Sequence, residues 1–188
     1  MTRPLLLALA LAASGAAGSG ALAQVAPGGP LPATSPALAE AAGRAGLVVV
    51  FWDAACPWTD RYADRLAALV TGYRSAGVGF AFVDVGGPVE EGAEGARRPA
   101  GPLVPDAGGA VAAAFGVQRA PHVFFFGPDR TLLYDGAVDD SPAFPDRVGA
   151  PYLRLALDQS IAGLPVEVQR TQAFGCKVDA PAAGASGR

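Results

Sequence analysis

The run LVVVFW, residues 47–52, is apolar throughout, and most of its residues are β-branched or aromatic. A strand with one face in solvent alternates apolar and polar residues, whereas this run has no polar position. It therefore predicts a strand that is buried on both faces. VGFAFVDV, residues 78–85, is a second run of this kind. Together the two runs indicate a sheet that needs helices packed on both of its sides.

The segment between these runs has a different periodicity, which predicts a helix over residues 57–75. Pro57 suits a first helical turn, where its missing N–H costs nothing, and Gly77 suits the end of a helix. Apolar residues recur at steps of three and four and form one helical face: Tyr62, Leu66, Leu69, Val70 and Tyr73.

The rest of the chain adds further elements to this unit. Residues 86–102 are polar and rich in Gly and Pro, which indicates a surface excursion. The order of elements predicts an α/β fold, a central mixed sheet flanked by helices, with a C-terminal antiparallel hairpin at one edge. The predicted elements are a short helix over 36–44 capped by Ser35, another over 106–115 capped by Asp106, strands over 122–127 and 131–136 joined by the turn GPDR at 127–130, and a last helix over 150–162.

The first residues have the pattern of a secretory signal peptide. Arg3 gives a positive start, an apolar run follows over residues 5–13, and Ala21-Leu22-Ala23 provides a cleavage site before Gln24. An uncleaved anchor is the alternative, although the apolar run is short for a membrane span. We therefore expect a periplasmic or secreted protein without a stable membrane anchor after cleavage. The predicted divisions are a signal peptide at 1–23, a flexible lead at 24–35, a domain at 36–178 and a disordered tail at 179–188.

Composition argues against some functions and indicates the compartment in which the cysteines act. The net charge is -3 and no basic patch is present, so we expect no binding of nucleic acid. No Gly-rich phosphate loop or flavin fingerprint occurs, so we expect no cofactor. Cys56 and Cys176 are the only cysteines, an even count that suits an oxidising compartment.

Several landmarks occur in an order that resembles the thioredoxin fold. The first strand and VVVFWDAACPW lead into a helix at Cys56-Pro57, and Ala120-Pro121 precedes the third strand. A hairpin follows, and Gly175-Cys176 comes after the last helix. The set most resembles secreted redoxins, the relatives of membrane-tethered thioredoxin-like proteins and of peroxiredoxins. The resemblance covers roughly residues 36–178.

The sequence departs from both standard catalytic patterns of these relatives. A dithiol thioredoxin has a second cysteine three positions after the first, and here the motif is Cys56-Pro57-Trp58-Thr59. The active site is therefore degenerate in this respect. The other departures are Val50, where the family places a buried acid in the first strand, and Val49 and Asp53, where peroxiredoxins place Pro and Thr.

The predicted position of Cys56 favours a reactive thiol. The N-terminus of a helix presents unpaired N–H groups, which stabilise a thiolate and lower its pKa. Thr59, one turn along, can donate its hydroxyl to that thiolate, and Trp58 would shield one side. The alternative is a buried cysteine that serves only as a small apolar residue.

The sequence leaves three states open for Cys176: a structural disulfide with Cys56, a resolving cysteine that pairs reversibly with it, or a free surface thiol. We favour the reversible pair. The resemblance implies that Pro121 is the cis-proline of the fold, and that the backbone at Ala120 and Pro121 binds an incoming peptide. His122 is the only histidine, and we expect it to point away from Cys56. Arg119 is expected on the surface.

The resemblance implies an exported thiol–disulfide oxidoreductase in which Cys56 is the nucleophile and Cys176 its resolving partner. Its partners would be protein thiols or disulfides, and an external thiol would reduce it. One alternative is a thiol peroxidase. Another is a copper-handling module that uses Cys56, Cys176 and His122. A third is a catalytically silent interaction module that keeps only the fold.

Overall fold

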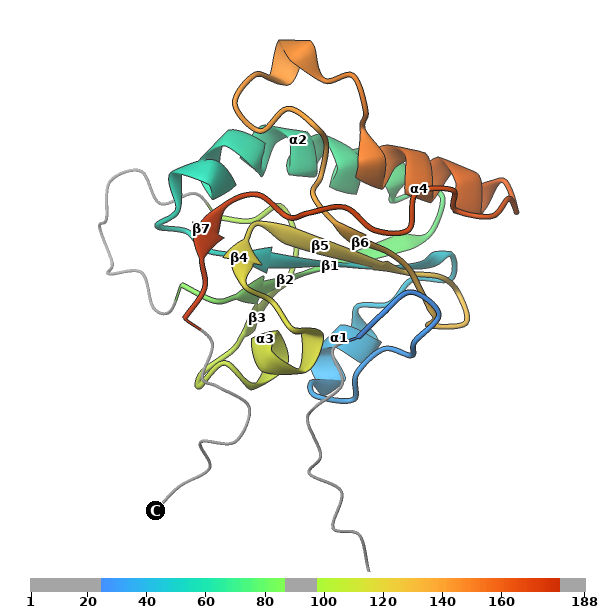
Figure 1. The fold of residues 1–188 in the computed structure, drawn as a ribbon. Coiled ribbons are helices and arrows are strands. Elements are labelled where there is room, and N and C mark those ends of the chain that lie inside the picture. Colours follow the sequence, from blue (N-terminus) through green and yellow to red (C-terminus); the bar gives the residue numbers. More distant parts are fainter. Residues whose placement is uncertain (1–24, 87–97, 180–188) are drawn as a thin grey trace, which may run out of the picture.

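The computed structural model describes residues 25–86 and 98–179, which form a central sheet between two layers of helices (Figure 1). The sheet has five strands in the order β3-β2-β1-β5-β6. β1 pairs with β2 in parallel and with β5 in antiparallel orientation, so the predicted mixed sheet is confirmed. The strands are β1 (Gly46–Trp52), β2 (Val78–Asp84), β3 (Leu103–Pro105), β5 (His122–Phe126) and β6 (Leu132–Gly136).

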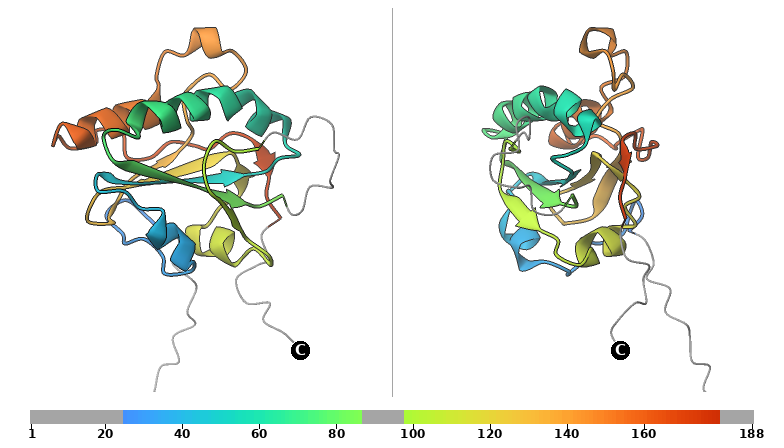
Figure 2. Two further views of the ribbon diagram at one scale, coloured as in Figure 1. Left: turned by 180° about the vertical axis from the view of Figure 1, so that it is seen from behind. Right: turned by 90° about the vertical axis from the view of Figure 1, so that its left-hand side faces the viewer.

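Helices cover both faces of the sheet, as the apolar runs require. α2 (Pro57–Tyr73) and α4 (Tyr152–Ile161) lie on one face, and α1 (Pro36–Glu40) and α3 (Ala110–Phe115) on the other (Figures 1 and 2). Successive residues of β1 enter opposite cores: Val48 and Val50 pack under α2 and α4, and Val49 and Phe51 pack over α1 and α3. This division explains why β1 contains no polar residue.

The hairpin and the longest helix follow the sequence prediction closely. β5 pairs with β6 in antiparallel orientation through the turn at residues 127–130, as predicted. α2 begins at Pro57 with Cys56 as its N-cap, and it ends at Tyr73, before Gly77 with its φ of +87°. The predicted end at residue 75 is therefore two residues late.

Asp106 caps α3 from a greater distance than we expected. Its carboxylate accepts hydrogen bonds from the N–H groups of Val111 and Ala112 at 2.9 and 2.8 Å. The helix begins at Ala110, because Gly108 and Gly109 adopt positive φ angles and form a turn between the acid and the first helical residue. The cap was predicted correctly, and the start of the helix was not.

Three short strands and one helical turn were not predicted from sequence. β3 extends the sheet beyond β2, and β4 (Arg119–Ala120) pairs with β7 (Cys176–Lys177) in a separate two-stranded sheet. A single turn of 3-10 helix, η1, spans Pro145–Arg147. Strands of two or three residues are too short for alternation to be visible, so periodicity cannot identify them.

The lead before α1 makes specific contacts with the hairpin. The N–H of Gly28 donates to the carbonyl of Leu132 at 2.9 Å, and the N–H of Leu132 donates to the carbonyl of Gly29 at 2.8 Å. Val25 is buried in the core beneath the sheet. This part of the lead, expected to be flexible, is thus paired with β6.

Three segments named in the sequence prediction lie outside the described residues. They are the signal peptide at 1–23, the middle of the excursion at 87–97 and nearly all of the tail, 180–188. Within residues 25–86 and 98–179, no helix combines the length and the apolar character that crossing a membrane requires.

Candidate active site at the Cys56–Cys176 disulfide

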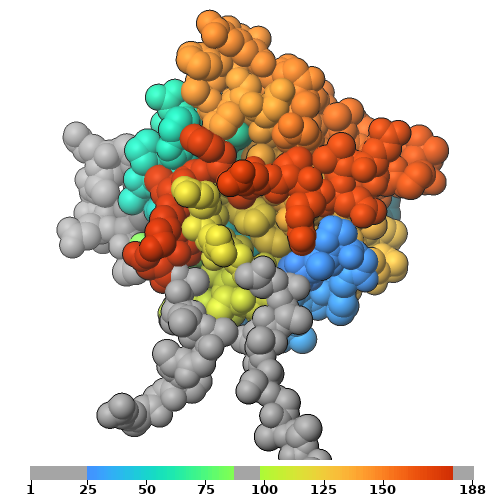
Figure 3. Space-filling model, viewed as in Figure 1, coloured from blue at the N-terminus to red at the C-terminus, as the bar shows by residue number. Residues whose placement is uncertain are grey.

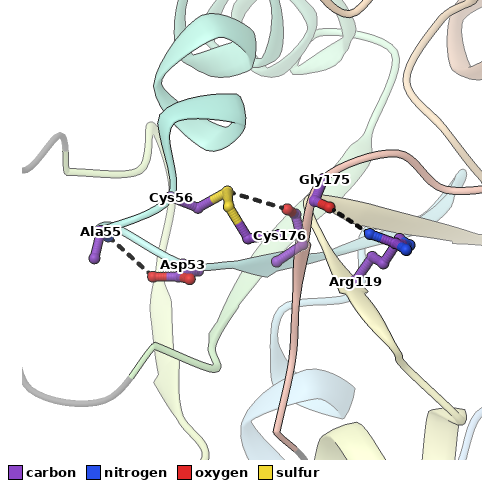
Figure 4. The surroundings of a disulfide bond; sticks show 7 residues. Asp53, Ala55, Cys56, Arg119, Gly175 and Cys176 are labelled. Atoms are coloured by element: carbon purple, nitrogen blue, oxygen red, sulfur yellow. Dashed lines mark hydrogen bonds between the residues drawn. A yellow bond between two sulfur atoms is a disulfide. The ribbon is translucent and has the colours of Figure 1, made fainter.

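The two cysteines are joined in a disulfide (Figure 4). Their sulfurs are 2.04 Å apart and their Cα atoms 5.9 Å apart, although 120 positions separate them in sequence. Cys56 caps α2 and Cys176 lies in β7. The bond rules out the free surface thiol among the three states that the sequence left open for Cys176, and it is compatible with both a structural and a reversible disulfide.

The turn before α2 is fixed by Asp53. The Asp53 side chain accepts a hydrogen bond from the N–H of Ala55 at 2.9 Å (Figure 4). The main-chain carbonyl of Asp53 accepts another from the N–H of Cys56 at 3.1 Å. The carbonyl of Cys56 then accepts the first helical bond, from the N–H of Asp60 at 3.3 Å. Asp53 therefore shapes the turn that delivers Cys56 to the helix N-terminus.

Cys56 is more buried than we expected of a nucleophile, since only 2% of its surface is exposed. Its sulfur contacts Cys176 and lies 3.5 Å from the carbonyl oxygen of Ala120. A disulfide sulfur carries no proton, so this contact becomes a hydrogen bond only when the thiol is formed. Cys176 is half-buried and is thus the more exposed residue of the pair.

The segment that carries Cys176 runs alongside β4. Ala120 is opposite Cys176 and Arg119 is opposite Lys177 in an antiparallel register. The Ala120-Pro121 peptide bond is cis, as predicted. The Arg119 guanidinium donates to the carbonyl of Gly175 at 2.9 Å, so this exposed arginine holds the segment beside the disulfide.

Trp58 and Thr59 surround the start of α2 in different ways. Trp58 packs edge-to-face on Phe174, with ring centroids 4.6 Å apart, so it shields the site by contacting the C-terminal segment. Thr59 is 1% exposed, and within the described residues its hydroxyl has no hydrogen-bond partner. Thr59 thus lies one turn from Cys56, and its hydroxyl is unpaired in the oxidised protein.

His122 belongs to another cluster. Its ring stacks on Phe124 with centroids 4.3 Å apart, and Nε2 lies 3.9 Å from a carboxylate oxygen of Asp135. Arg170 donates to Asp135 from Nη2 and Nε, at 2.6 and 2.9 Å. Burial raises the pKa of Asp135, but His122 and Arg170 outweigh it and the net pKa is lowered. This cluster links the C-terminal segment to the sheet.

A mainly apolar hollow of about 510 Å³ lies beside Trp58 and Phe174. α2 fixes one wall of it through Arg65, whose guanidinium donates to the Asp139 carboxylate at 2.5 Å and to the carbonyls of Ser141 and Pro142 at 3.0 Å. Burial and the neighbouring Asp139 raise the pKa of Tyr62, which donates to the same carboxylate. The residues that line the hollow include Trp58, Phe174, Ala137, Pro142, Ala143 and Tyr152.

Sequence reasoning proposed the two cysteines, Trp58, Thr59, Ala120 and Pro121 as site residues, and they lie together at one end of the sheet. It missed the residues that build the surroundings. Phe174 and Arg170 occur in an irregular segment, and Arg65 lies on the polar face of a helix, where most arginines only contact solvent. The residues that it did not assign to the site are Arg65, Asp139, Arg170, Thr171 and Phe174.

The described residues contain no group of three His, Cys, Asp or Glu side chains placed to hold a metal ion. The copper-handling alternative needed Cys56, Cys176 and His122 as ligands. Because the two sulfurs are bonded to each other and His122 is engaged with Asp135 and Phe124, these three residues do not form a ligand set in this state.

No family model and no curated protein matches the sequence. Solved structures that resemble this one include an uncharacterized conserved protein from Geobacillus kaustophilus, 24% identical, with a TM-score of 0.63 over 75% of this chain and 80% of that one. A hypothetical protein from Sinorhizobium meliloti is 27% identical, with a TM-score of 0.62 over 75% and 82% of the two chains. A weaker match is the thioredoxin domain of a thiol-disulfide oxidoreductase from Bacteroides vulgatus, 14% identical, with a TM-score of 0.46 over 60% and 89%.

The topology itself defines the class of protein. A mixed sheet in the order β3-β2-β1-β5-β6, helices on both faces, a cysteine at the start of the helix after β1, and a cis-proline before β5 together make this a thioredoxin-like fold. Within that class, this chain places the second cysteine in a C-terminal strand rather than in the first helical turn.

Proposed function

We propose that this protein is an exported thioredoxin-like thiol–disulfide oxidoreductase in which Cys56 is the nucleophile and Cys176 is the resolving cysteine. The observation that carries the proposal is the disulfide between the N-cap of α2 and a strand beside the cis-proline. Thr59 stands where a dithiol thioredoxin has its second cysteine, and in this proposal Cys176 supplies that second sulfur.

The proposed cycle needs only the two cysteines and an external dithiol. The dithiol reduces the Cys56–Cys176 bond with two electrons and is itself oxidised to a disulfide. The Cys56 thiolate then attacks a disulfide in a protein substrate, forms a mixed disulfide and releases one substrate thiolate. The Cys176 thiolate attacks the Cys56 sulfur, releases the second substrate thiol and restores the internal disulfide.

Two features support a reactive Cys56 after reduction. It caps a helix of 17 residues, whose first N–H groups favour an anion. The unpaired Thr59 hydroxyl is available to donate to that anion. The Ala120 carbonyl, 3.5 Å away, acts in the opposite sense, because it can accept a hydrogen bond only from the protonated thiol. Trp58, Ala120 and Pro121 would contact the substrate.

The proposal includes export, so the mature chain would act in the periplasm or outside the cell. It assigns residues 1–23 to a signal peptide and residues 36–178 to the catalytic domain. The predicted partners are protein thiols or disulfides and an external thiol reductant. The cycle is written without a cofactor, because each step transfers electrons between sulfurs alone.

The test compares two single variants with the unaltered protein. Cys56→Ser is expected to abolish reduction of insulin by dithiothreitol, followed as turbidity, down to the uncatalysed rate. Cys176→Ser keeps the nucleophile, so it is expected to accumulate a mixed disulfide with the substrate that mass spectrometry detects. Full activity in Cys56→Ser would overturn the proposal. Oxidation of Cys56 by hydrogen peroxide, without any disulfide exchange, would instead favour the thiol peroxidase alternative.

A further inference from the structure

β7 is paired with β4 by main-chain contacts, in the manner of a separate peptide added to a strand edge. We infer that β7 is an internal occupant of a docking edge on β4, and that this edge selects a partner whose reacting cysteine follows a glycine. The inference rests on the proposed function and specifies its substrate class. In the oxidised protein the edge is closed by the chain itself, and reduction opens it.

The contacts of β7 are those of strand addition. Ala120 is opposite Cys176 in the register, and the N–H of Val178 donates to the carbonyl of Gln118 at 2.9 Å. β4 and β7 form a two-stranded sheet separate from the five-stranded one. Without β7, β4 would present unpaired main-chain groups, and such an edge binds extended peptides. Figure 3 shows the C-terminal segment, in red, lying against the yellow segment that contains β4.

The position before the cysteine has room only for glycine. A Cβ atom at Gly175 would lie 1.9 Å from the carbonyl oxygen of Ala120 and 2.5 Å from its carbonyl carbon. It would also lie 2.9 Å from the nitrogen of Pro121. All three are main-chain atoms, which cannot rotate away as a side chain can. Gly175 does not have a positive φ, so the restriction comes from space and not from backbone conformation.

A partner segment that replaces β7 meets the same restriction. To bring its cysteine opposite Ala120 in the register of Cys176, it must pass the Ala120 carbonyl at the same distance. Any residue with a side chain at the preceding position forces the segment away from β4 and lengthens its main-chain hydrogen bonds. The edge therefore discriminates between a Gly-Cys and an Ala-Cys segment.

β7 can separate from β4 while the chain before it stays attached to the sheet at Thr171. Thr171 is fixed to the sheet separately: its N–H donates to the carbonyl of Asp135 at 3.0 Å, and its hydroxyl lies 2.7 Å from that of Tyr134. Residues 172–178 follow this anchor, and the five steps from Thr171 to Cys176 span at most about 17 Å when extended. The released Cys176 stays within that radius and can return to resolve a mixed disulfide.

The first experiment uses the full chain carrying Cys176→Ser, in reduced form, so that only Cys56 reacts. Two peptides of the same sequence, one with Gly and one with Ala before a single cysteine, are each joined to thionitrobenzoate through a disulfide. Attack of the Cys56 thiolate on the peptide sulfur forms the mixed disulfide and releases the thionitrobenzoate anion, which is followed by absorbance. The Gly-Cys peptide is expected to react about tenfold faster, the effect of losing one or two main-chain hydrogen bonds.

The second experiment tests the internal occupant with the matched pair Gly175→Ala and Gly72→Ala. Gly72 lies in α2, where an added Cβ meets nothing within 4 Å. Gly175→Ala is expected to shift the equilibrium between the Cys56–Cys176 disulfide and glutathione about tenfold towards the reduced protein. Gly72→Ala is expected to leave that equilibrium unchanged. Equal equilibria in the two variants would overturn the inference.

A reagent without a peptide distinguishes the reactivity of Cys56, on which the proposed function depends, from the selection of a Gly-Cys segment by the β4 edge. The symmetric disulfide of thionitrobenzoate has no main chain to pair with β4, so it reports the reactivity of Cys56 alone. Reaction with this reagent, together with equal rates for the two peptides, would overturn the inference and leave the proposed function standing. No reaction with it at the reduced Cys56 would overturn the proposed function itself.

Discussion

At the residue scale, the most informative side chain beside the disulfide is Thr59. It is almost fully buried, and its hydroxyl has no partner among the described residues. Leaving a buried hydroxyl unpaired costs about 1–3 kcal/mol, and in the proposed function a thiolate at Cys56 is the acceptor expected for it. On that proposal, the hydroxyl is expected to favour the reduced state over the oxidised one.

Replacing this hydroxyl by a methyl group tests its role. In Thr59→Val, the pKa of the reduced Cys56 thiol is expected to rise, because the thiolate loses a donor, and the oxidised protein is expected to gain about 1 kcal/mol of stability. The pH dependence of iodoacetamide alkylation measures the first change, and urea unfolding the second. Thr59→Ser keeps the hydroxyl and serves as control. Identical alkylation profiles for the Val and Ser variants would exclude a role for the hydroxyl.

The unequal burial of the two cysteine residues predicts where an external thiol attacks. Cys176 is half-buried and Cys56 is 2% exposed, and attack at Cys176 also releases the helix-capping sulfur, the better leaving group. A brief reaction of the oxidised protein with glutathione, quenched with acid, is expected to place glutathione on Cys176 and leave Cys56 as a free thiol. Peptide mapping by mass spectrometry reads this out. Glutathione found chiefly on Cys56 would contradict the prediction.

At the scale of elements, the segment after α4 has two separate attachments. Residues 169–171 pair with the end of β6, and residues 176–178 pair with β4. The first attachment includes the Thr171 hydroxyl, which accepts from the N–H of Ala137 at 3.0 Å and lies 2.7 Å from the Tyr134 hydroxyl. This anchor keeps Cys176 near Cys56 whether or not the two are bonded.

Weakening the attachment of Thr171 to the sheet should therefore slow formation of the Cys56–Cys176 disulfide without changing the reactivity of Cys56. In Thr171→Val, re-formation of the Cys56–Cys176 disulfide after removal of reductant is expected to slow up to about tenfold, because Cys176 is less concentrated near its partner. Alkylation of the reduced Cys56 should keep its normal rate. Thr131→Val, which loses a hydroxyl bond to Asp129 in the hairpin turn, is the matched control. Equal closure rates in the two variants would argue against the anchor.

At the scale of the whole molecule, the disulfide joins the start of α2 to the last described strand. Both core clusters lie elsewhere, under α2 and α4 on one face and over α1 and α3 on the other. The fold should therefore survive reduction. The cross-link contributes chiefly by restricting the unfolded chain, and for a separation of 120 residues this amounts to about 4–5 kcal/mol.

Reduction is accordingly expected to lower the melting temperature without abolishing the cooperative transition. For a chain of this size, a loss of about 4–5 kcal/mol corresponds to a fall in Tm of about 10–20 °C. Calorimetry with and without a phosphine reductant measures it, and the double variant Cys56→Ser and Cys176→Ser should melt at one temperature in both conditions. A Tm that reductant leaves unchanged in the unaltered protein would show that the cross-link adds nothing.

The elements that sequence predicted share a strong local pattern. The apolar runs of β1 and β2, the three-and-four spacing of α2 and the turn between β5 and β6 each occupy enough consecutive residues to be recognised. The elements it missed, β3, β4 and β7, are two or three residues long and exist because of the strand they pair with. Their formation depends on partners distant in the chain.

The sequence by itself determined the layered α/β plan and the placement of Cys56 at a helix N-terminus, since both follow from contiguous patterns of residue size and polarity. Only the tertiary structure decided that Cys176 bonds to Cys56, that Gly175 passes against the Ala120 carbonyl, and that Phe174 packs on Trp58. These contacts join segments more than 50 residues apart, and a pattern within one segment carries no information on which distant segment will lie beside it.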